Sequence, residues 1–203
     1  MKIGVSMWSY FRPWKEGRID IPGFIHEAKK AGAQGVELLD FFYKDIEKER
    51  ELAQEALDET GLMIPIFSVA NNFAKHTPEE RAAQVDRIKF GVDEANRYGA
   101  RVVRVFAGDV AEGITFDQAR AWIVEGLSEA SQYAAKTGVK LALENHGGIT
   151  ATPDQMLRII ERVNESPWFG VNLDGGNFHS DDPYRDLARI APYAINAQLK
   201  TDV

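Results

Sequence analysis

Short apolar runs alternate with longer amphipathic stretches along the whole chain. The runs are rich in Val, Ile, Leu and Phe, a composition typical of buried strands. They cover residues 3–7, 35–39, 63–69, 101–106, 140–144, 169–173 and 193–199. The stretches between them repeat their apolar positions with a helical period and predict helices over about 21–31, 44–60, 78–98, 116–137, 153–163 and 184–190.

Glycine and proline mark the ends of these predicted helices. A glycine follows the last periodic residue of four helices, where a left-handed cap favours it; these are Gly32, Gly61, Gly99 and Gly138. Thr77 and Thr152 each stand before a proline and nearby acidic residues, a pattern typical of a helix N-terminus. The loops that lead from helix to strand are therefore expected to be short.

The strict alternation of strand and helix predicts parallel strands joined by right-handed crossovers. An open doubly wound sheet and a barrel both satisfy that pattern. No glycine-rich phosphate loop follows the first strand, and polar or aromatic residues follow nearly every strand, which favours a barrel. We therefore predict a (β/α)8 TIM-type barrel forming one domain over residues 1–203. Such barrels typically need about 250 residues. Either the eighth βα unit is therefore expected to be missing, or a neighbouring chain is expected to cover the open edge.

Charge and composition narrow the function classes. The formal net charge is −7, whereas nucleic-acid binding needs a basic face, so no nucleic-acid partner is expected. No apolar run approaches the roughly 18 residues of a membrane-spanning helix, and no secretory leader is recognisable. The absence of cysteine excludes disulfides and thiolate metal sites and fits a cytoplasmic protein.

An acid, an amide and an imidazole end the fifth predicted strand, as Glu144, Asn145 and His146, and two glycines follow. A carboxylate at a barrel mouth is costly unless it is paired, hydrogen-bonded or bound to a metal. The structural alternative is a rim carboxylate neutralised by a lysine or a backbone amide. The sequence leaves both interpretations open.

The sixth predicted strand repeats this design. Asp174 ends an apolar run and is followed by two glycines, Asn177 and His179. Oxygen ligands from adjacent strands suit a hard divalent ion such as Mg²⁺ or Mn²⁺. Capping of the loop through the glycines is the structural alternative for Asp174.

Gln198 and Lys200 lie two residues apart on the seventh predicted strand and so point to the same side. Lys200 is expected either to steady a negative oxygen or to pair with an acid on another strand. Glu37, inside the second strand, is interpreted as structural and as needing a cation from Lys200 or Arg104.

Aromatic and amide side chains lie just past several strand ends, among them Trp8, Asn71 and Phe106. Aromatic walls with a few amides suit the apolar face and the hydroxyl edge of a sugar. For any single aromatic residue, packing in the core or at the rim is the alternative.

The motifs at 143–146, 173–178 and 198–200, with those at 4–9 and 35–38, resemble the xylose isomerase-like barrels, specifically the sugar phosphate isomerase/epimerase family. The resemblance covers essentially the whole chain. In that family, acids on the fifth and sixth strands bind a divalent metal together with a histidine from the seventh strand and a glutamate from the eighth. The resemblance implies that Glu144 is a metal ligand and acid/base and that Asp174 is a ligand. Gln198 stands where the seventh-strand histidine is often found, and Asn177 where another histidine often follows the sixth-strand acid.

The expected function is therefore a divalent-metal-dependent isomerase or epimerase of a ketose or sugar phosphate, acting by proton transfer through an enediolate. Mn²⁺ or Mg²⁺ is the expected ion, with Co²⁺ or Zn²⁺ as alternatives. The expected catalytic residues are Glu144 and His146, and the expected metal ligands are Glu144, Asp174 and Gln198. The expected substrate-binding residues are Trp8, Asn71, Phe106, Asn145, Asn177, His179 and Lys200.

Two other functions stay open on the same scaffold: a lyase or dehydratase acting on a polyol or keto acid, and a non-catalytic sugar-binding barrel. A nuclease, as in the related endonuclease IV, is disfavoured by the acidic balance. The sequence leaves open whether the chain forms a homo-oligomer.

Overall fold

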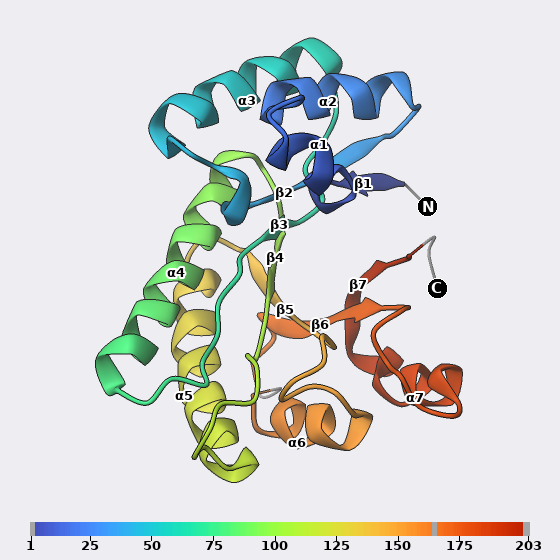
Figure 1. Ribbon diagram of the computed structural model, residues 1–203. Coiled ribbons are helices and arrows are strands. Elements are labelled where there is room, and N and C mark those ends of the chain that lie inside the picture. The colour runs from blue at the N-terminus through green and yellow to red at the C-terminus, as the bar shows by residue number, and fades with distance from the viewer. Residues whose placement is uncertain (1–2, 164–165, 201–203) are drawn as a thin grey trace.

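Seven parallel strands form one curled sheet in the computed structural model, which describes residues 3–163 and 166–200 (Figure 1). The strands are β1 (Gly4–Ser6), β2 (Gly35–Leu39), β3 (Phe67–Ser68), β4 (Val102–Val105), β5 (Lys140–Glu144), β6 (Phe169–Asp174) and β7 (Ala194–Gln198). Each strand pairs with the next one along the chain, so the strand order in the sheet is β1 to β7. This order confirms the predicted barrel-type fold.

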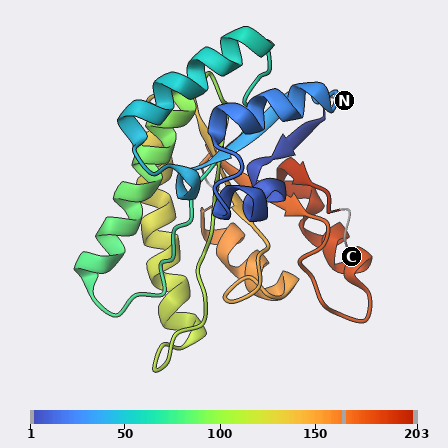
Figure 2. The same ribbon diagram turned by 45° about the horizontal axis from the view of Figure 1, so that its top comes forward.

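Helices cover the outside of the curled sheet (Figures 1 and 2). The long helices are α2 (Ile21–Lys30), α3 (Ile46–Thr60), α4 (Pro78–Arg97), α5 (Phe116–Ala135), α6 (Pro153–Val163) and α7 (Pro183–Ile190). Their predicted bounds were right to within two residues. Four short elements were not predicted, because none is long enough to repeat an apolar period: α1 (Phe11–Lys15) and the 3-10 turns η1 (Met7–Tyr10), η2 (Asp40–Phe42) and η3 (Ala191–Tyr193).

The predicted helix signals act as expected. Thr77 forms a capping box with Glu80, in which each side chain accepts a hydrogen bond from the other residue's backbone N–H. The four predicted cap glycines, Gly32, Gly61, Gly99 and Gly138, all have a positive φ, between 66° and 83°. An L side chain is strained there, so glycine ends these helices at low cost.

Strand β3 is much shorter than its predicted range of 63–69. Pro65 interrupts the run, and proline has no N–H to donate to a neighbouring strand. Before the proline, Met63 still forms an isolated parallel bridge to Gly35. The chain therefore follows the sheet from residue 63 onward but becomes a regular strand only at Phe67.

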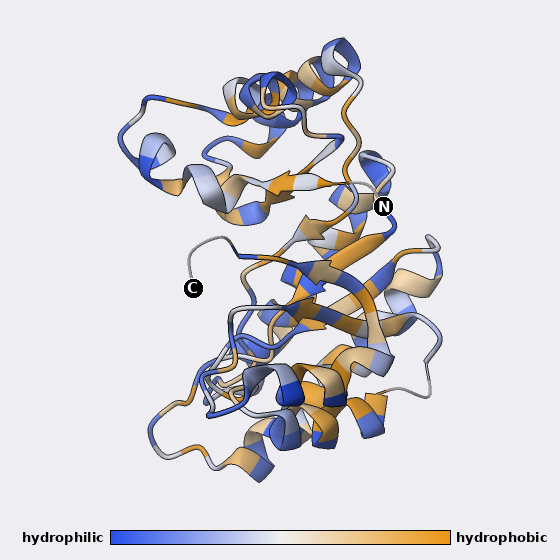
Figure 3. Cartoon of the chain, turned by 90° about the vertical axis from the view of Figure 1, so that its right-hand side faces the viewer, coloured by the Kyte–Doolittle hydropathy of each residue, from blue (hydrophilic) through white to orange (hydrophobic). Residues whose placement is uncertain are grey.

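Hydrophobic residues gather along the strands and the inner faces of the helices (Figure 3). In the described part of the chain no strand lies between β7 and β1, which form the two edges of the sheet. Figures 1 and 2 show these edges on the same side of the molecule. The hydrophobic core does not cover these edges, since Ile3 and Ile195 are exposed there. None of the described helices is both long and apolar enough to cross a membrane.

Candidate active site

Six neighbouring strands each contribute one polar side chain to a layer near the carboxyl ends of the sheet. The residues, from β2 to β7, are Glu37, Ser68, Arg104, Glu144, Asn172 and Gln198. The strand register explains this convergence: Ser68 pairs with Arg104, and Glu144 pairs with Asn172. Hydrogen bonds and one ion pair connect these side chains across the interior of the sheet.

Glu144 ends β5 with its carboxylate surrounded by N–H donors. Its Oε1 lies 3.0 Å from Nδ1 of His146 and accepts a hydrogen bond from Nδ2 of Asn177 at 3.1 Å. Its Oε2 accepts from Nδ2 of Asn172 at 3.0 Å and lies 3.1 Å from Nε of Arg104. Among the described residues Nε of Arg104 has no hydrogen-bond partner, so its contact with Oε2 is an ion pair alone.

The charge of Glu144 is stabilised by these neighbours. Burial by itself raises the pKa of this carboxyl group, but Arg104, His146 and Asn172 together hold the pKa below its usual range. Glu144 is therefore ionised near neutral pH. A carboxylate accepts but cannot donate, so the contact with Glu144 is a hydrogen bond in the tautomer that carries the proton on Nδ1 of His146. The same nitrogen lies 3.2 Å from Nδ2 of Asn177.

Phe106 packs against two of the partners of Glu144, His146 and Arg104. Its ring centroid is 4.3 Å from that of the His146 imidazole and 4.0 Å from Cζ of Arg104. The guanidinium also donates from Nη1 to the backbone carbonyl of Val69 at 2.9 Å. Phe106, predicted to bind substrate, thus packs against the His146 ring at an interplanar angle of 31°.

Asp174 ends β6 beside a lysine. Nζ of Lys200 lies 3.3 Å from Oδ1 of Asp174, which also accepts from the backbone N–H of Gly176 at 2.9 Å. Lys200 donates a second hydrogen bond to Oδ1 of Asn177. Burial raises the pKa of Asp174, and the negative charge of Glu144 adds to the rise, whereas Gly176 and Lys200 oppose it.

Glu37 has neutral partners, which corrects the sequence expectation that Lys200 or Arg104 supplies it with a cation. Nε2 of Gln198 lies 3.0 and 2.9 Å from the two carboxylate oxygens of Glu37, and the Ser68 hydroxyl donates to one of them. Lys200 and Arg104 pair with Asp174 and Glu144 instead. Hydrogen bonds from neutral groups thus satisfy the buried carboxylate in place of an ion pair.

The oxygens predicted to bind a divalent ion face N–H donors. Nδ2 of Asn172 lies between two of them, 3.0 Å from Oε2 of Glu144 and 2.9 Å from Oε1 of Gln198. Lys200 occupies Oδ1 of Asp174. Among the described residues no three His, Cys, Asp or Glu side chains group so as to hold a metal ion. As arranged, these residues do not fit a divalent ion, and the predicted ligand set stays a prediction.

Two of the predicted substrate-binding amides are engaged by backbone. Nδ2 of Asn71 donates to the carbonyl of Phe106 at 2.7 Å, and its Oδ1 accepts from the Phe106 N–H at 2.9 Å. Asn145 forms the same pair of hydrogen bonds with the backbone of Asp174, both at 2.9 Å. Both side chains are buried. Their hydrogen bonds connect the ends of neighbouring strands.

Trp8 and His179 lie outside the contacts around Glu144. Trp8 is exposed and stacks on Phe11 with ring centroids 5.0 Å apart, in an aromatic cluster that also contains Phe41. His179 is exposed beyond β6, and none of the contacts described for the chain joins it to Glu144 or Asp174. Their role in substrate binding stays a prediction.

Sequence reasoning missed the partnership of Arg104 with Glu144 and the bridging role of Asn172. Both residues carried a signal, because each interrupts an otherwise apolar strand, as in Val102-Val103-Arg104-Val105. A buried polar residue needs a partner. Which partner it finds depends on the strand register, which the sequence pattern does not specify.

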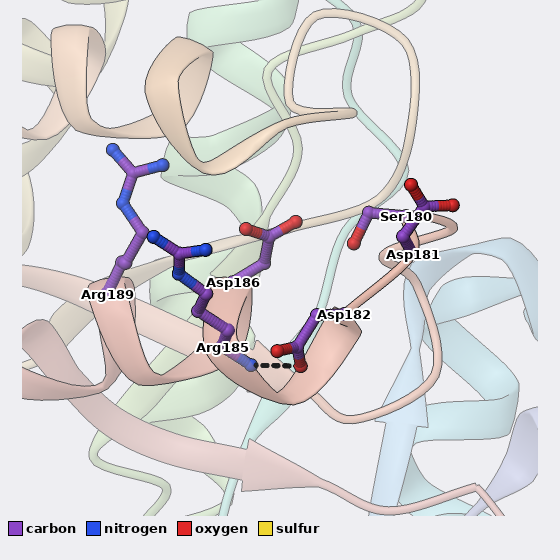
Figure 4. Close-up of a pocket in the computed structure, with 6 residues that line it drawn as sticks. All are labelled: Ser180, Asp181, Asp182, Arg185, Asp186 and Arg189. Carbon is purple, nitrogen blue, oxygen red and sulfur yellow. Dashed lines mark hydrogen bonds between the residues drawn. The ribbon is translucent and has the colours of Figure 1, made fainter.

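The hollow in Figure 4, about 400 Å³ in volume, is separate from these residues. It is lined by Ser180, Asp181, Asp182, Arg185, Asp186 and Arg189. The Asp182 carboxylate accepts from the backbone N–H of Arg185 at 3.0 Å and thereby caps α7. None of the predicted site residues lines this hollow.

Known proteins with this fold include sugar epimerases. The chain is similar to the apo structure of 3-keto-D-glucoside 4-epimerase, YcjR, from E. coli, with 19% identity and a TM-score of 0.80 over 100% of this chain and 80% of that one. It is similar to the probable 3-DHS dehydratase AsbF of Bacillus anthracis, with 18% identity and a TM-score of 0.77 over 97% of this chain and 72% of that one. A third similar structure is a xylose isomerase-like TIM barrel protein from Mycobacterium smegmatis in complex with magnesium, with 18% identity and a TM-score of 0.76 over 98% of this chain and 74% of that one.

No curated protein matches the sequence. Residues 25–201 match the family described as xylose isomerase-like TIM barrel. This match covers most of the chain and agrees with the seven parallel strands and their helices. The chain belongs to the xylose isomerase-like TIM barrel family.

Proposed function

We propose that this protein is a sugar isomerase or epimerase in which His146 moves the proton and Glu144 positions it. The observation that carries the proposal is the 3.0 Å contact between Nδ1 of His146 and Oε1 of Glu144. In the tautomer with the proton on Nδ1, Nε2 is the ring nitrogen that can accept a proton. The His146 side chain is 51% exposed and that of Glu144 only 4%, so the imidazole is the group a substrate can reach.

The reaction needs two proton transfers at carbon, one that removes a proton and one that adds a proton. His146 takes a proton from the carbon next to a carbonyl, and the electrons of the C–H bond pass to the carbonyl oxygen to give an enediolate. Transfer of the hydroxyl proton from one enediolate oxygen to the other, followed by return of the first proton to the former carbonyl carbon, gives the isomer. Return of a proton to the opposite face of the same carbon, from a second acid, gives the epimer. Glu144 stabilises the imidazolium that forms in between, because its negative charge lies against the protonated ring.

The surroundings of His146 support a polyhydroxylated substrate. The Asn177 amide and the Lys200 ammonium lie beside the Glu144–His146 pair and offer hydrogen-bond donors. Phe106 forms an apolar wall on one side of the imidazole. We propose a ketose or sugar phosphate as the substrate class, in keeping with the sugar epimerase among the similar structures.

No step of this proposal uses a divalent ion, because the oxygens predicted to bind one face N–H donors. Mn²⁺ is therefore only an addition in the test. A lyase on the same scaffold shares the first proton transfer and then expels a hydroxyl group from the next carbon. The similarity to a probable dehydratase favours it as the second candidate.

The test is exchange of carbon-bound hydrogen with deuterated water over a panel of ketoses and ketose phosphates, with and without added Mn²⁺. We expect exchange accompanied by formation of an isomer or epimer, detected by NMR and mass spectrometry. Exchange with loss of water would identify the lyase instead. Sugar binding without exchange at any condition would contradict both and leave a binding protein.

A further inference from the structure

The buried carboxylate of Asp174 already has a cation at its side. Nζ of Lys200 is 3.3 Å from Oδ1 of Asp174 and also donates to Oδ1 of Asn177. One ammonium group is thus held between a carboxylate oxygen and an amide oxygen from the same loop. These two kinds of oxygen are also the ones that Mg²⁺ and Mn²⁺ prefer in proteins.

The position of Lys200 is set by the loop after β6. The lysine stem passes over Gly176, where an added Cβ would lie 2.8 Å from Cδ of Lys200 and 3.4 Å from its Cβ and Cγ. The backbone N–H of Gly175 donates to the carbonyl of Gln198 at 2.9 Å and ties this loop to the end of β7. The glycine at 176 therefore lets the lysine reach Asp174 from the neighbouring strand.

We propose that Lys200 is a tethered cation that occupies Asp174 and competes with divalent ions for it. The two cannot share the carboxylate oxygen without repulsion between like charges at close range. A divalent ion must displace the ammonium, and this displacement also releases Oδ1 of Asn177. This competition accounts for the misfit between the predicted ligands and the arrangement described above. It rests on the geometry around Asp174 and goes beyond the proposed proton transfer.

The experiment measures Mn²⁺ affinity by electron paramagnetic resonance, which needs no substrate and no activity. Removing the ammonium by Lys200→Met is expected to tighten Mn²⁺ binding about tenfold. This is the effect of removing a repulsion of roughly 1.4 kcal/mol between the ion and a nearby positive charge in a well-solvated setting. Lys200→Arg keeps the charge and is expected to stay near the wild-type affinity. Lys140→Met removes a lysine from the opposite end of a strand and is the matched control.

A second substitution locates the effect. Adding Asp174→Asn to Lys200→Met is expected to abolish the gain, because the ion then loses the carboxylate that the lysine had occupied. Thermal unfolding of each variant shows whether it is folded. Unchanged or weaker Mn²⁺ binding in folded Lys200→Met overturns the proposal, as does a gain that persists after Asp174→Asn.

Discussion

Nε of Arg104 lies 3.1 Å from Oε2 of Glu144, and both side chains are almost completely buried, 6% and 4% exposed. The guanidinium comes from β4 and the carboxylate from β5, so the ion pair joins two neighbouring strands inside the curled sheet. The cost of removing two charges from water is offset here by additional hydrogen bonds to each partner. The loss of either partner leaves an uncompensated charge.

Arg104→Met is therefore expected to destabilise the fold strongly. Breaking a buried pair by removing one partner typically costs about 3–5 kcal/mol. Urea unfolding measures this change in the free energy of unfolding. The control is Arg158→Met, which removes an exposed pair with Asp117 and is expected to cost less than about 1 kcal/mol. Equal small losses in the two variants would contradict the structural role of Arg104.

Glu94 on α4 predicts a pH dependence of stability. Nη2 of Arg50 is 2.8 Å from its Oε1, but its Oε2 is buried without a hydrogen-bond partner. Burial raises the pKa of Glu94, with Arg50 and Arg97 opposing the rise. A raised pKa in the folded state means that the contribution of Glu94 to stability is present below the unfolded-state pKa and is lost as the pH rises through the folded-state pKa.

Glu94→Gln removes this titration. The free energy of unfolding of the variant minus that of the wild type is expected to increase as the pH rises from the unfolded-state pKa of a glutamate through the raised folded-state pKa of Glu94. Chemical denaturation across this range measures the difference. Glu129→Gln, at an exposed residue paired with Lys89, is the control and should show no such trend. A difference that stays constant or falls with pH would be inconsistent with the raised pKa.

The two glycines after β5 differ in the space available for a side chain. Both have a positive φ, 68° at Gly147 and 50° at Gly148. A Cβ at Gly147 would meet no atom within 4 Å, whereas one at Gly148 would lie 2.6 Å from the carbonyl oxygen of Gly108. Gly147→Ala is expected to cost about 1–2 kcal/mol from the left-handed backbone alone, and Gly148→Ala more. Thermal unfolding of the pair checks this order, and equal costs would refute the close approach.

Much of the fold follows from the sequence. The alternation of apolar runs and amphipathic stretches predicts all seven strands and the six long helices, because each pattern reports burial that the fold requires. The short β3 shows that one residue can override this pattern, since Pro65 lacks the N–H donor that a regular strand needs. The end of each strand is less predictable than its existence.

The candidate site follows from the sequence only in part. Glu144, His146 and Asp174 stand out because polar groups abruptly end apolar runs. Their partners do not stand out, since the sequence suggests Lys200 or Arg104 as the cation for Glu37, whereas Arg104 lies against Glu144. That choice depends on the register of β4 against β5 and on the reach of long side chains. The sequence pattern contains neither of these.

The central claim is that His146 transfers the proton, and chemical rescue of exchange tests it most directly. His146→Ala is expected to lower the rate of hydrogen–deuterium exchange into the substrate by about 10²- to 10⁴-fold, and added imidazole should restore part of the loss. His26→Ala removes a histidine that faces Glu59 on the outer helices and should leave exchange unchanged. Undiminished exchange in His146→Ala would contradict the account.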